Sequence, residues 1–404
     1  MFINKKNAHP AHFFVSIGAG HNQIPLIKEA KELGFHVIGV DQNISAPGFP
    51  LCDLKIQESI DNHGLIYKML LELLVDGEIK GVCTRSYGTA LVTTSYLAER
   101  FNIPYLPYTA SHTFANKRRM KAALMKHGIL TPSVIHAVSE SKIAKLSPAS
   151  FPVIVKPAIG HAKTNVVLAA NPDEVFACLK TFENQEEVLI EKFIDGEEII
   201  VVGLIHQGTY HLVEMTDKTT LFPPSFVDVT HVTPSKHIGL AKKASEIAQK
   251  IAQSFGISTA PLVMEFVVTP EGELFLIEAV PEFGGEFLAD VLIPASCNYR
   301  IIRQVIRSMT GLGFTPPPAR KGRKAVAVRY IIGSNGTLVS FNPEGPYRVK
   351  GTIFARIFKE IGSPVREPVT NHDRIGVVVA QADSAEDALE ISKEAAASFN
   401  LRIK

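Results

Sequence analysis

The sequence predicts an α/β protein that opens with a mostly parallel sheet and continues as an α+β region. Three observations predict this class. Over roughly the first 110 residues, short apolar runs alternate with helical spacings, a pattern typical of an open parallel sheet covered on both faces. Further along, two apolar runs are joined by the turn signal Pro270–Gly272, which indicates a hairpin. The length of 404 residues is sufficient for two or three domains.

The elements expected in the first region follow from apolar runs of strand length and from helical periodicity. The expected strands are 13–17, 35–40, 81–84 and 103–106. The expected helices are 25–33, 65–74 and 90–101.

The same criteria apply to the rest of the chain. The expected strands are 151–157, 187–193, 199–205, 262–269, 273–280, 325–332 and 375–380. The expected helices are 116–128, 238–255 and 385–399. Three prolines at 316–318 and the basic run Arg320–Lys324 are interpreted as a solvated linker rather than a nucleic-acid patch.

Composition excludes several classes of protein. Hydrophobic residues make up 46% and charged residues 20%, which is typical of a globular chain and excludes a mainly disordered one. Lys plus Arg is 42 and Asp plus Glu is 40, a balance that argues against a dedicated nucleic-acid binder.

No apolar window reaches about 18 residues, so no transmembrane helix is expected. The N-terminus lacks a signal-peptide core, and we therefore expect a cytoplasmic protein without a membrane partner. The four cysteines are far apart and are expected to be free thiols.

A glycine pair near the N-terminus imitates a dinucleotide-binding fingerprint. Gly18 and Gly20 follow the first strand, and Asp41 stands about where a ribose-binding acid would lie. The third glycine position, however, is Gln23, and that glycine normally permits close packing of helix on strand. Two interpretations are therefore kept. One is an NAD(P) enzyme, and the other is a sheet whose first turn contains glycines because the backbone conformation requires them.

Charged residues embedded in apolar sequence form a stronger pattern in the middle of the chain. Lys117 begins a helix, and Lys156 ends a buried strand, where a lysine is costly unless an anion meets it. The acidic segment 189–198 follows, and Glu265 and Glu278 lie on the two strands of the expected hairpin. Carboxylates placed in this way suggest a shared Mg²⁺, for which oxygen ligands are suited. Two cations, two metal-binding carboxylates and an acidic segment predict a nucleoside triphosphate site.

In the order and spacing of these pieces, the chain resembles the ATP-grasp superfamily, which includes biotin carboxylase and D-alanine–D-alanine ligase. It is most similar to the carboxylate–amine ligases, especially the L-amino-acid (dipeptide) ligases. The likeness extends to residues 18–43, similar to a preATP-grasp domain, and to 372–377 and 384–388, similar to the C-terminal domain of those ligases. It implies an ATP-grasp fold with a parallel-sheet preATP-grasp domain at 1–113. It also implies an ATP-grasp domain of two subdomains at 114–312 and a C-terminal α+β domain at 313–404.

The resemblance also implies roles for individual residues. The implied ATP contacts are Lys117, Lys156, Gly160, His161, Lys163, Glu191, Lys192, Phe193, Ile194 and Glu198. The implied metal ligands, for Mg²⁺ or Mn²⁺, are Glu265 and Glu278, and His231 lies in a stretch similar to a substrate-side strand. Each residue has a structural alternative: a helix-surface lysine at Lys117, solvated charges at Glu191 and Glu198, or a polar core residue at His231.

The sequence departs from the family pattern at the reaction centre. The phosphate loop 160–166 has one glycine, and Val280 replaces an asparagine that often completes the second metal site. Glu282 stands where an arginine usually holds the substrate carboxylate or acyl phosphate. We hypothesise that Glu282 meets a cationic or amino group of the substrate. The missing positive charge would then come from Arg300, Arg303 or Arg329.

What the resemblance implies is an ATP-dependent ligase. It would join a small carboxylate to an amine through an acyl phosphate, release ADP and phosphate, and act on amino-acid-like substrates without nucleic acid. Homodimers are common among the relatives. The alternatives are an ATP-grasp carboxylase or purine-pathway ligase, and a catalytically silent nucleotide-binding protein.

Overall fold

The computed structural model describes residues 11–404 apart from 75–76, 136–142, 144–145, 183–186, 222–224 and 286. The first ten residues, on which the expectation of no signal peptide partly rests, lie outside the described residues. In the described part no helix is long and apolar enough to cross a membrane. All four cysteines are free, as the sequence predicts.

The N-terminal region is a parallel sheet in the strand order β3-β2-β1-β4. Its strands are β1 (Ala11–Ile17), β2 (His36–Val40), β3 (Leu54–Ile56) and β4 (Gly77–Cys83). Its helices are α1 (Ile24–Glu32), α2 (His63–Leu73), α3 (Thr89–Arg100) and α4 (Tyr108–Phe114). Strand side chains such as Phe14, Val15 and Ile17 are fully buried, as expected for a sheet covered on both faces.

The strand predicted at 103–106 is wrong. Ile103, Tyr105 and Leu106 are buried, but the backbone there is irregular. Pro104 and Pro107 lack an N–H to donate to a neighbouring strand, so burial without a sheet partner is the outcome. The apolar residues therefore predicted correctly that this segment is buried, but predicted wrongly that it forms a strand.

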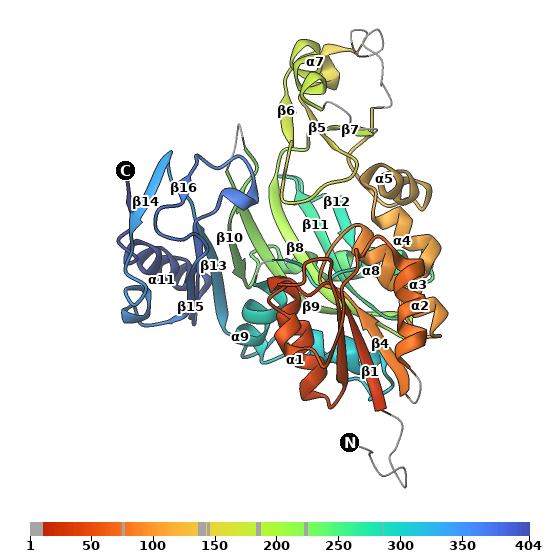
Figure 1. Ribbon diagram of the computed structural model, residues 1–404. Helices are drawn as coiled ribbons and strands as arrows, with labels where there is room; N and C mark the ends of the chain where they lie inside the picture. The colour runs from red at the N-terminus through yellow and green to blue at the C-terminus, as the bar shows by residue number, and fades with distance from the viewer. Residues whose placement is uncertain are drawn as a thin grey trace.

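A small lobe follows helix α5 (Lys117–Lys126), and Figure 1 shows it standing away from the rest of the molecule. It contains a three-stranded sheet in the order β6-β5-β7. The lobe's elements are β5 (Val153–Pro157), β6 (Val167–Ala169), α7 (Pro172–Thr181) and β7 (Val188–Lys192). Val153, Val155 and Ile190 belong to a hydrophobic cluster separate from the main core.

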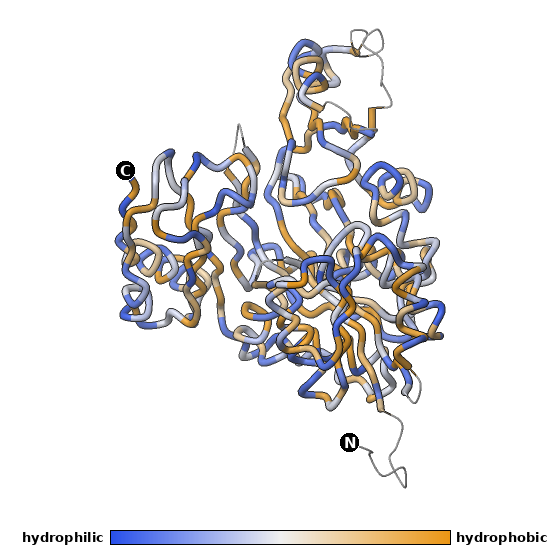
Figure 2. The backbone as a smooth tube through the Cα atoms, in the orientation of Figure 1, coloured by the Kyte–Doolittle hydropathy of each residue, from blue (hydrophilic) through white to orange (hydrophobic). Residues whose placement is uncertain are grey.

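The largest sheet has eight strands in the order β12-β11-β8-β9-β10-β13-β17-β15, and every neighbouring pair is antiparallel. Its strands are β8 (Glu197–His206), β9 (Thr209–Thr220), β10 (Asp228–Thr233), β11 (Ala260–Val268), β12 (Leu274–Val280), β13 (Ala325–Ile331), β15 (Thr352–Ile357) and β17 (Gly376–Ala382). The helices that accompany it are α8 (Ala241–Ser254), α9 (Ile293–Cys297), α10 (Ile301–Met309) and α11 (Ala385–Ala397). The predicted hairpin is confirmed as β11 and β12. Figure 2 shows hydrophobic segments concentrated along the strands and polar ones along the outer loops and helix faces.

The C-terminal part adds a small sheet in the order β16-β14-β18. Its strands are β14 (Gly336–Ser340), β16 (Pro364–Val365) and β18 (Arg402–Ile403). The large sheet itself continues past residue 313, because β13 pairs with β10. The interpretation of Arg320–Lys324 as solvated needs one correction: Arg323 Nη1 donates hydrogen bonds to Val213 O at 2.6 Å and to Glu214 Oε2 at 3.2 Å. A buried carboxylate draws this arginine onto the sheet.

Candidate active site

A cavity of about 550 Å³ lies where the small lobe, the large sheet and the N-terminal region meet. Apart from the three arginines offered for the missing positive charge, every residue that the sequence analysis assigned to the ATP, metal or substrate site lines this cavity. These residues are Lys117, Lys156, Gly160, His161, Lys163, Glu191, Lys192, Phe193, Ile194, Glu198, His231, Glu265, Glu278 and Glu282. Residues scattered over 166 positions in the sequence, from 117 to 282, are thus brought to one cavity.

The three arginines lie elsewhere. The guanidinium of Arg300 donates to Glu29 Oε1 and to Glu32 Oε2, both at 2.6 Å, on the N-terminal helix α1. Helix α10 packs against α1, so two carboxylates hold this arginine away from the cavity. Arg303 pairs with the same two glutamates, and Arg329 donates to Ser392 Oγ at 3.0 Å.

A buried ion cluster closes the lobe side of the cavity. Glu191 on β7 lies opposite Ile154 on β5, and its carboxylate accepts a hydrogen bond from Lys156. Lys121 Nζ, on α5, lies 3.2 Å from the other oxygen of Glu191. Burial raises the pKa of Glu191, but the ammonium groups of Lys156 and Lys121 outweigh burial and hold that pKa below its ordinary value. Lys121 was missed because a lysine inside an amphipathic helix normally faces water.

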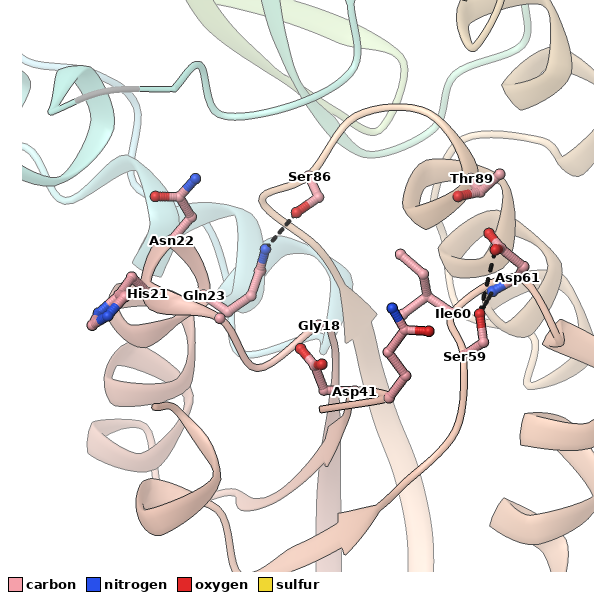
Figure 3. Close-up of a pocket in the computed structure, with 12 residues that line it drawn as sticks. Gly18, His21, Asn22, Gln23, Asp41, Ser59, Ile60, Asp61, Ser86 and Thr89 are labelled. Carbon is pink, nitrogen blue, oxygen red and sulfur yellow. Dashed lines mark hydrogen bonds between the residues drawn. The ribbon is translucent and has the colours of Figure 1, made fainter. Parts of the chain in front are cut away.

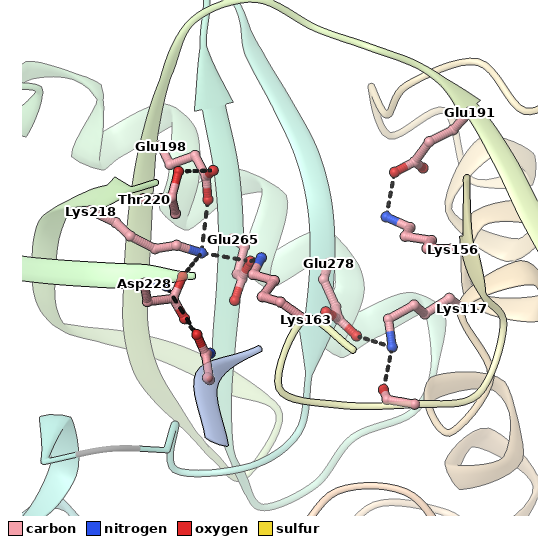
Figure 4. A network of polar contacts seen from close by, with 12 residues as sticks. Lys117, Lys156, Lys163, Glu191, Glu198, Lys218, Thr220, Asp228, Glu265 and Glu278 are labelled. Carbon is pink, nitrogen blue, oxygen red and sulfur yellow. Dashed lines mark hydrogen bonds and ion pairs between the residues drawn. The ribbon is translucent and has the colours of Figure 1, made fainter. Parts of the chain in front are cut away.

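The two predicted metal ligands face each other across the hairpin. Glu265 on β11 and Glu278 on β12 are directly opposed in the antiparallel register. Lys163 Nζ lies 3.2 Å from Glu265 Oε2, and Lys117 Nζ lies 3.4 Å from Glu278 Oε1 (Figure 4). Each carboxylate therefore has a lysine partner in this structure.

This pair of carboxylates fits a magnesium ion. Among the described residues no cluster of three or more His, Cys, Asp or Glu side chains could hold a metal alone. Mg²⁺ does not need such a cage, because it is commonly held by one or two carboxylates with substrate phosphates and water completing the octahedron. Two adjacent hard oxygen donors at the wall of a polar cavity meet that requirement.

Lys218 on β9, which the sequence analysis did not single out, contacts three carboxylates that line the cavity. Its ammonium group is buried and lies 2.8 Å from Glu198 Oε2, 3.2 Å from Asp228 Oδ1 and 3.2 Å from Glu265 Oε2. Burial lowers the pKa of Lys218, but the three carboxylates outweigh it and raise that pKa well above its ordinary value. Figure 4 shows the ammonium group at the centre of this network.

The loop 160–166 is attached at both sides of the cavity. Lys117 Nζ donates to Gly160 O at 2.6 Å, and the backbone N–H of Asn371 donates to Ala162 O at 3.0 Å. The rings of His161 and His372 meet edge to face with centroids 5.6 Å apart. The C-terminal region therefore contributes to the cavity, a contribution that the sequence analysis did not predict.

A second cavity of about 490 Å³ lies at the carboxyl edge of the N-terminal sheet (Figure 3). It is lined by Gly18, Gly20 and Asp41, the residues of the apparent dinucleotide fingerprint. Both oxygens of Asp41 accept backbone N–H groups, from Ala19 and Asn43, each at 2.9 Å. The geometry thus gives Asp41 a structural role in fixing the glycine-rich turn.

Gln23 has a comparable structural role beside that turn. Its side chain lies against Gly18, where a Cβ would meet Gln23 Cγ at 3.2 Å. Gln23 Nε2 also donates to Ser86 Oγ at 2.8 Å. Asn22 and Ser86 line both cavities, so the two adjoin at this point.

Comparison with known proteins places these features in a family context. Residues 149–290 match the model of an ATP-grasp domain, and residues 329–404 match that of an L-amino acid ligase C-terminal domain 2. The fold is similar to that of an L-amino acid ligase from Bacillus licheniformis, with a TM-score of 0.81, 20% identity and coverage of 98% of this chain and 99% of that one. A phosphoribosylglycinamide synthetase from Anaerococcus prevotii gives a TM-score of 0.75 at 20% identity over 98% of this chain and 100% of that one. A D-alanine–D-alanine ligase from Pelobacter propionicus is 26% identical over 186 residues, which are 43% of this chain and 59% of that enzyme.

Proposed function

Because the chain belongs to the ATP-grasp superfamily and ends in an L-amino acid ligase C-terminal domain 2, we propose that it joins an amino-acid-like carboxylate to an amine at the expense of ATP. The observation that carries the proposal is the single cavity that gathers Lys117, Lys156, Glu265 and Glu278. ADP and phosphate are the other products. The domain division at residues 113 and 313 is part of the same proposal.

ATP binds between the small lobe and the large sheet in this proposal. Lys192, Phe193 and Ile194 form the strand end and turn that contact the adenine, with Glu191 beside its amino group. Glu198 takes the ribose hydroxyls. Lys117, Lys156 and the loop 160–166 hold the phosphates, for which ammonium groups and a covering loop are suited.

Glu265 and Glu278 would hold Mg²⁺, and the ion would supply charge neutralisation on the phosphoryl group when bound. The lysines now paired with these carboxylates carry the same sign of charge as the ion. Binding of the nucleotide therefore requires an exchange of partners, in which Lys117 and Lys163 leave their glutamates for phosphate oxygens.

In the first step, a carboxylate oxygen of the acid attacks the γ-phosphorus. The bond from that phosphorus to the β,γ-bridging oxygen breaks, and ADP leaves with the electron pair. The chain's contribution is to align the reactants and to stabilise the developing charge with fixed cations. The loop 160–166, attached to Asn371 on the far side, keeps water from the acyl phosphate.

In the second step, the neutral amine attacks the acyl carbon, the carbon–oxygen bond to phosphate breaks, and phosphate leaves. As the amide forms, the attacking nitrogen loses a proton to the departing phosphate. Before the attack, the ammonium form of the amine must lose a first proton. We assign Glu282, a cavity-lining carboxylate, to hold the ammonium form and to accept that proton. His231, buried on β10 in the same wall, contacts the substrate side.

Phosphate release measured with mixtures of L-amino acids, followed by mass spectrometry of the product, tests this function. Glu278→Gln should lower amino-acid-dependent kcat about a hundredfold or more, because it removes a carboxylate that would hold the magnesium ion against the transferring phosphoryl group. Glu271→Gln is the matched control: Glu271 is exposed in the turn of the same hairpin and should retain full activity.

Three results separate the candidate functions. Amino-acid-dependent turnover with a new amide product supports the ligase. Turnover that depends on bicarbonate instead of amino acids supports a carboxylase. Nucleotide binding without ADP formation across the acid and amine panel contradicts both enzymes and supports a silent nucleotide-binding protein.

A further inference from the structure

An arginine that the sequence analysis did not consider lies in the wall of the active-site cavity. Arg85 follows strand β4, and its side chain is only 5% exposed. It is the one arginine among the described residues that line the cavity. A guanidinium is always charged in proteins, so its burial needs compensation from negative groups.

The compensation that the described residues provide is partial. Nη2 of Arg85 donates to Asp290 Oδ1 at 3.0 Å, and Nη1 donates to Asn22 O at 2.9 Å. The backbone N–H of Arg85 donates to Gln23 Oε1 at 2.8 Å. The side chain is therefore fixed in place by the N-terminal region on one side and by the segment after Gly285 on the other.

Two polar atoms in this loop are buried and lack a hydrogen-bond partner among the described residues. They are Nε of Arg85 and the hydroxyl of Tyr87. Buried polar groups are nearly always partnered in native proteins, so two such atoms within three residues require an explanation. A ligand that rearranges the loop when it binds would supply the partners.

The loop lies next to the phosphoryl-transfer end of the cavity. Lys117 Nζ is 5.1 Å from the centre of the Tyr87 ring, and the same ammonium group is paired with Glu278. Burial, with the charges of Glu278 and Glu282 adding to it, raises the pKa of Tyr87 well above its ordinary value. The tyrosine hydroxyl therefore remains a neutral hydrogen-bond donor throughout the working pH range.

We infer that Arg85 anchors the carboxylate that is to be phosphorylated and so determines that the substrate is an acid. This inference rests on the ligase function proposed above and deepens it. A guanidinium presents five N–H donors in a rigid fork, which matches a carboxylate better than any other side chain. Asp290 acts as a positioning residue, because it holds Nη2 and thereby orients the remaining donors.

The assignment resolves the charge reversal at Glu282. Arg300, Arg303 and Arg329 are engaged elsewhere, and Arg85 brings a positive charge into the cavity from the N-terminal region. With Arg85 and Glu282 in one cavity, a cation and an anion are both available. That combination suits a substrate pair with one carboxylate and one ammonium group to be recognised.

The test measures steady-state ADP release with a mixture of L-amino acids for wild type, Arg85→Gln and Arg85→Lys. Arg85→Gln should raise the KM for the acid about ten- to hundredfold, the range for loss of hydrogen bonds to a charged group, and leave the KM for ATP within twofold. Arg85→Lys should recover part of the loss, since it restores the charge without the fork. Arg100→Gln is the matched control, because Arg100 stacks on Tyr96 at the surface of α3.

Each outcome decides between the proposals. Amino-acid-dependent turnover in which Arg85→Gln keeps the wild-type KM for the acid overturns the assignment and leaves the ligase function standing. An equal rise in the KM for ATP and for the acid, with a lowered melting temperature, identifies a structural role and also overturns the assignment. No acid-dependent ADP release by the wild type overturns the ligase function and this inference together.

Discussion

At the scale of single residues, the cavity depends on charged side chains that stand among apolar neighbours, where burial is costly unless an opposite charge meets them. Lys156, Glu265 and Glu278 interrupt apolar strands, and this contrast with their neighbours made them candidates in the sequence that prove to line one cavity. Lys218 was not predicted because the second half of β9 is rich in threonine and charged residues. In such a stretch the sequence does not distinguish a buried lysine from an exposed one. Arg85 was not predicted for a related reason. It lies in a short polar loop, and its side chain contacts Asp290, which is 205 positions away in the sequence.

Replacement of Lys218 should be costly for stability. Lys218→Met removes the shared partner of three carboxylates, including Asp228 and Glu265, and leaves buried negative charge uncompensated. We expect a loss of about 3–5 kcal/mol in the free energy of unfolding, measured by urea denaturation. Lys242→Met is the control, because the Lys242 side chain is 91% exposed and its pair with Glu246 should contribute little. Equal stability of the two variants would contradict the network.

The pH dependence of stability should reflect Glu191. Its pKa is below the ordinary value of 4.5 in the folded protein, so in acid the unfolded chain binds a proton that the folded protein does not. The contribution of this group is therefore complete above about pH 4.5 and is lost as the pH falls towards the folded-state pKa. Unfolding curves between pH 6 and about 3 should show falling stability, with a shallower fall in Glu191→Gln. Parallel slopes for both proteins would rule out this contribution.

At the scale of elements, periodicity located the strands and helices that bury one clear face. The hairpin of β11 and β12 was predictable because two apolar runs flank a strong turn signal, and its register places Glu265 opposite Glu278. Strand β9 was not predictable, since buried polar groups such as Glu214 and Lys218 break its alternation. The segment 103–106 shows the converse error, in which apolar residues are buried without joining a sheet.

The turn between β7 and β8 supplies a test at this scale. Gly196 lies there, and a Cβ on it would be 2.3 Å from Val268 O, a backbone atom of the neighbouring strand. Gly196→Ala should therefore separate β8 from β11, lower the free energy of unfolding and raise the KM for ATP through the shift of Glu198. In Gly64→Ala, nothing lies within 4 Å of the new Cβ, and the helical position should make that variant at least as stable as wild type. Wild-type stability and KM in Gly196→Ala would contradict the close packing.

At the scale of the whole molecule, the sequence indicated a parallel sheet followed by a hairpin-containing region and the order of the regions along the chain. It did not indicate which regions contact one another. Adjacent strands of one sheet come from either side of residue 313, and Asn371 and His372 reach the cavity from the C-terminal region. Arg85 and Asn22 reach it from the N-terminal region. Such contacts depend on how regions pack, which local periodicity does not encode. The charged residues in the middle of the chain predicted one shared site there, but the contributions of the N-terminal and C-terminal regions could not be predicted in this way.

The central claim is that a carboxylate oxygen becomes bonded to phosphorus before the amide forms. The most direct measurement uses L-amino acids labelled with ¹⁸O in their carboxylates, with ATP, Mg²⁺ and the wild-type protein. Mass spectrometry of the released phosphate should find one ¹⁸O atom for each amide formed, because the acyl phosphate passes that oxygen to phosphate when the amine attacks. Phosphate that is released without ¹⁸O while ADP accumulates would contradict the acyl-phosphate route and, with it, the function proposed for this cavity.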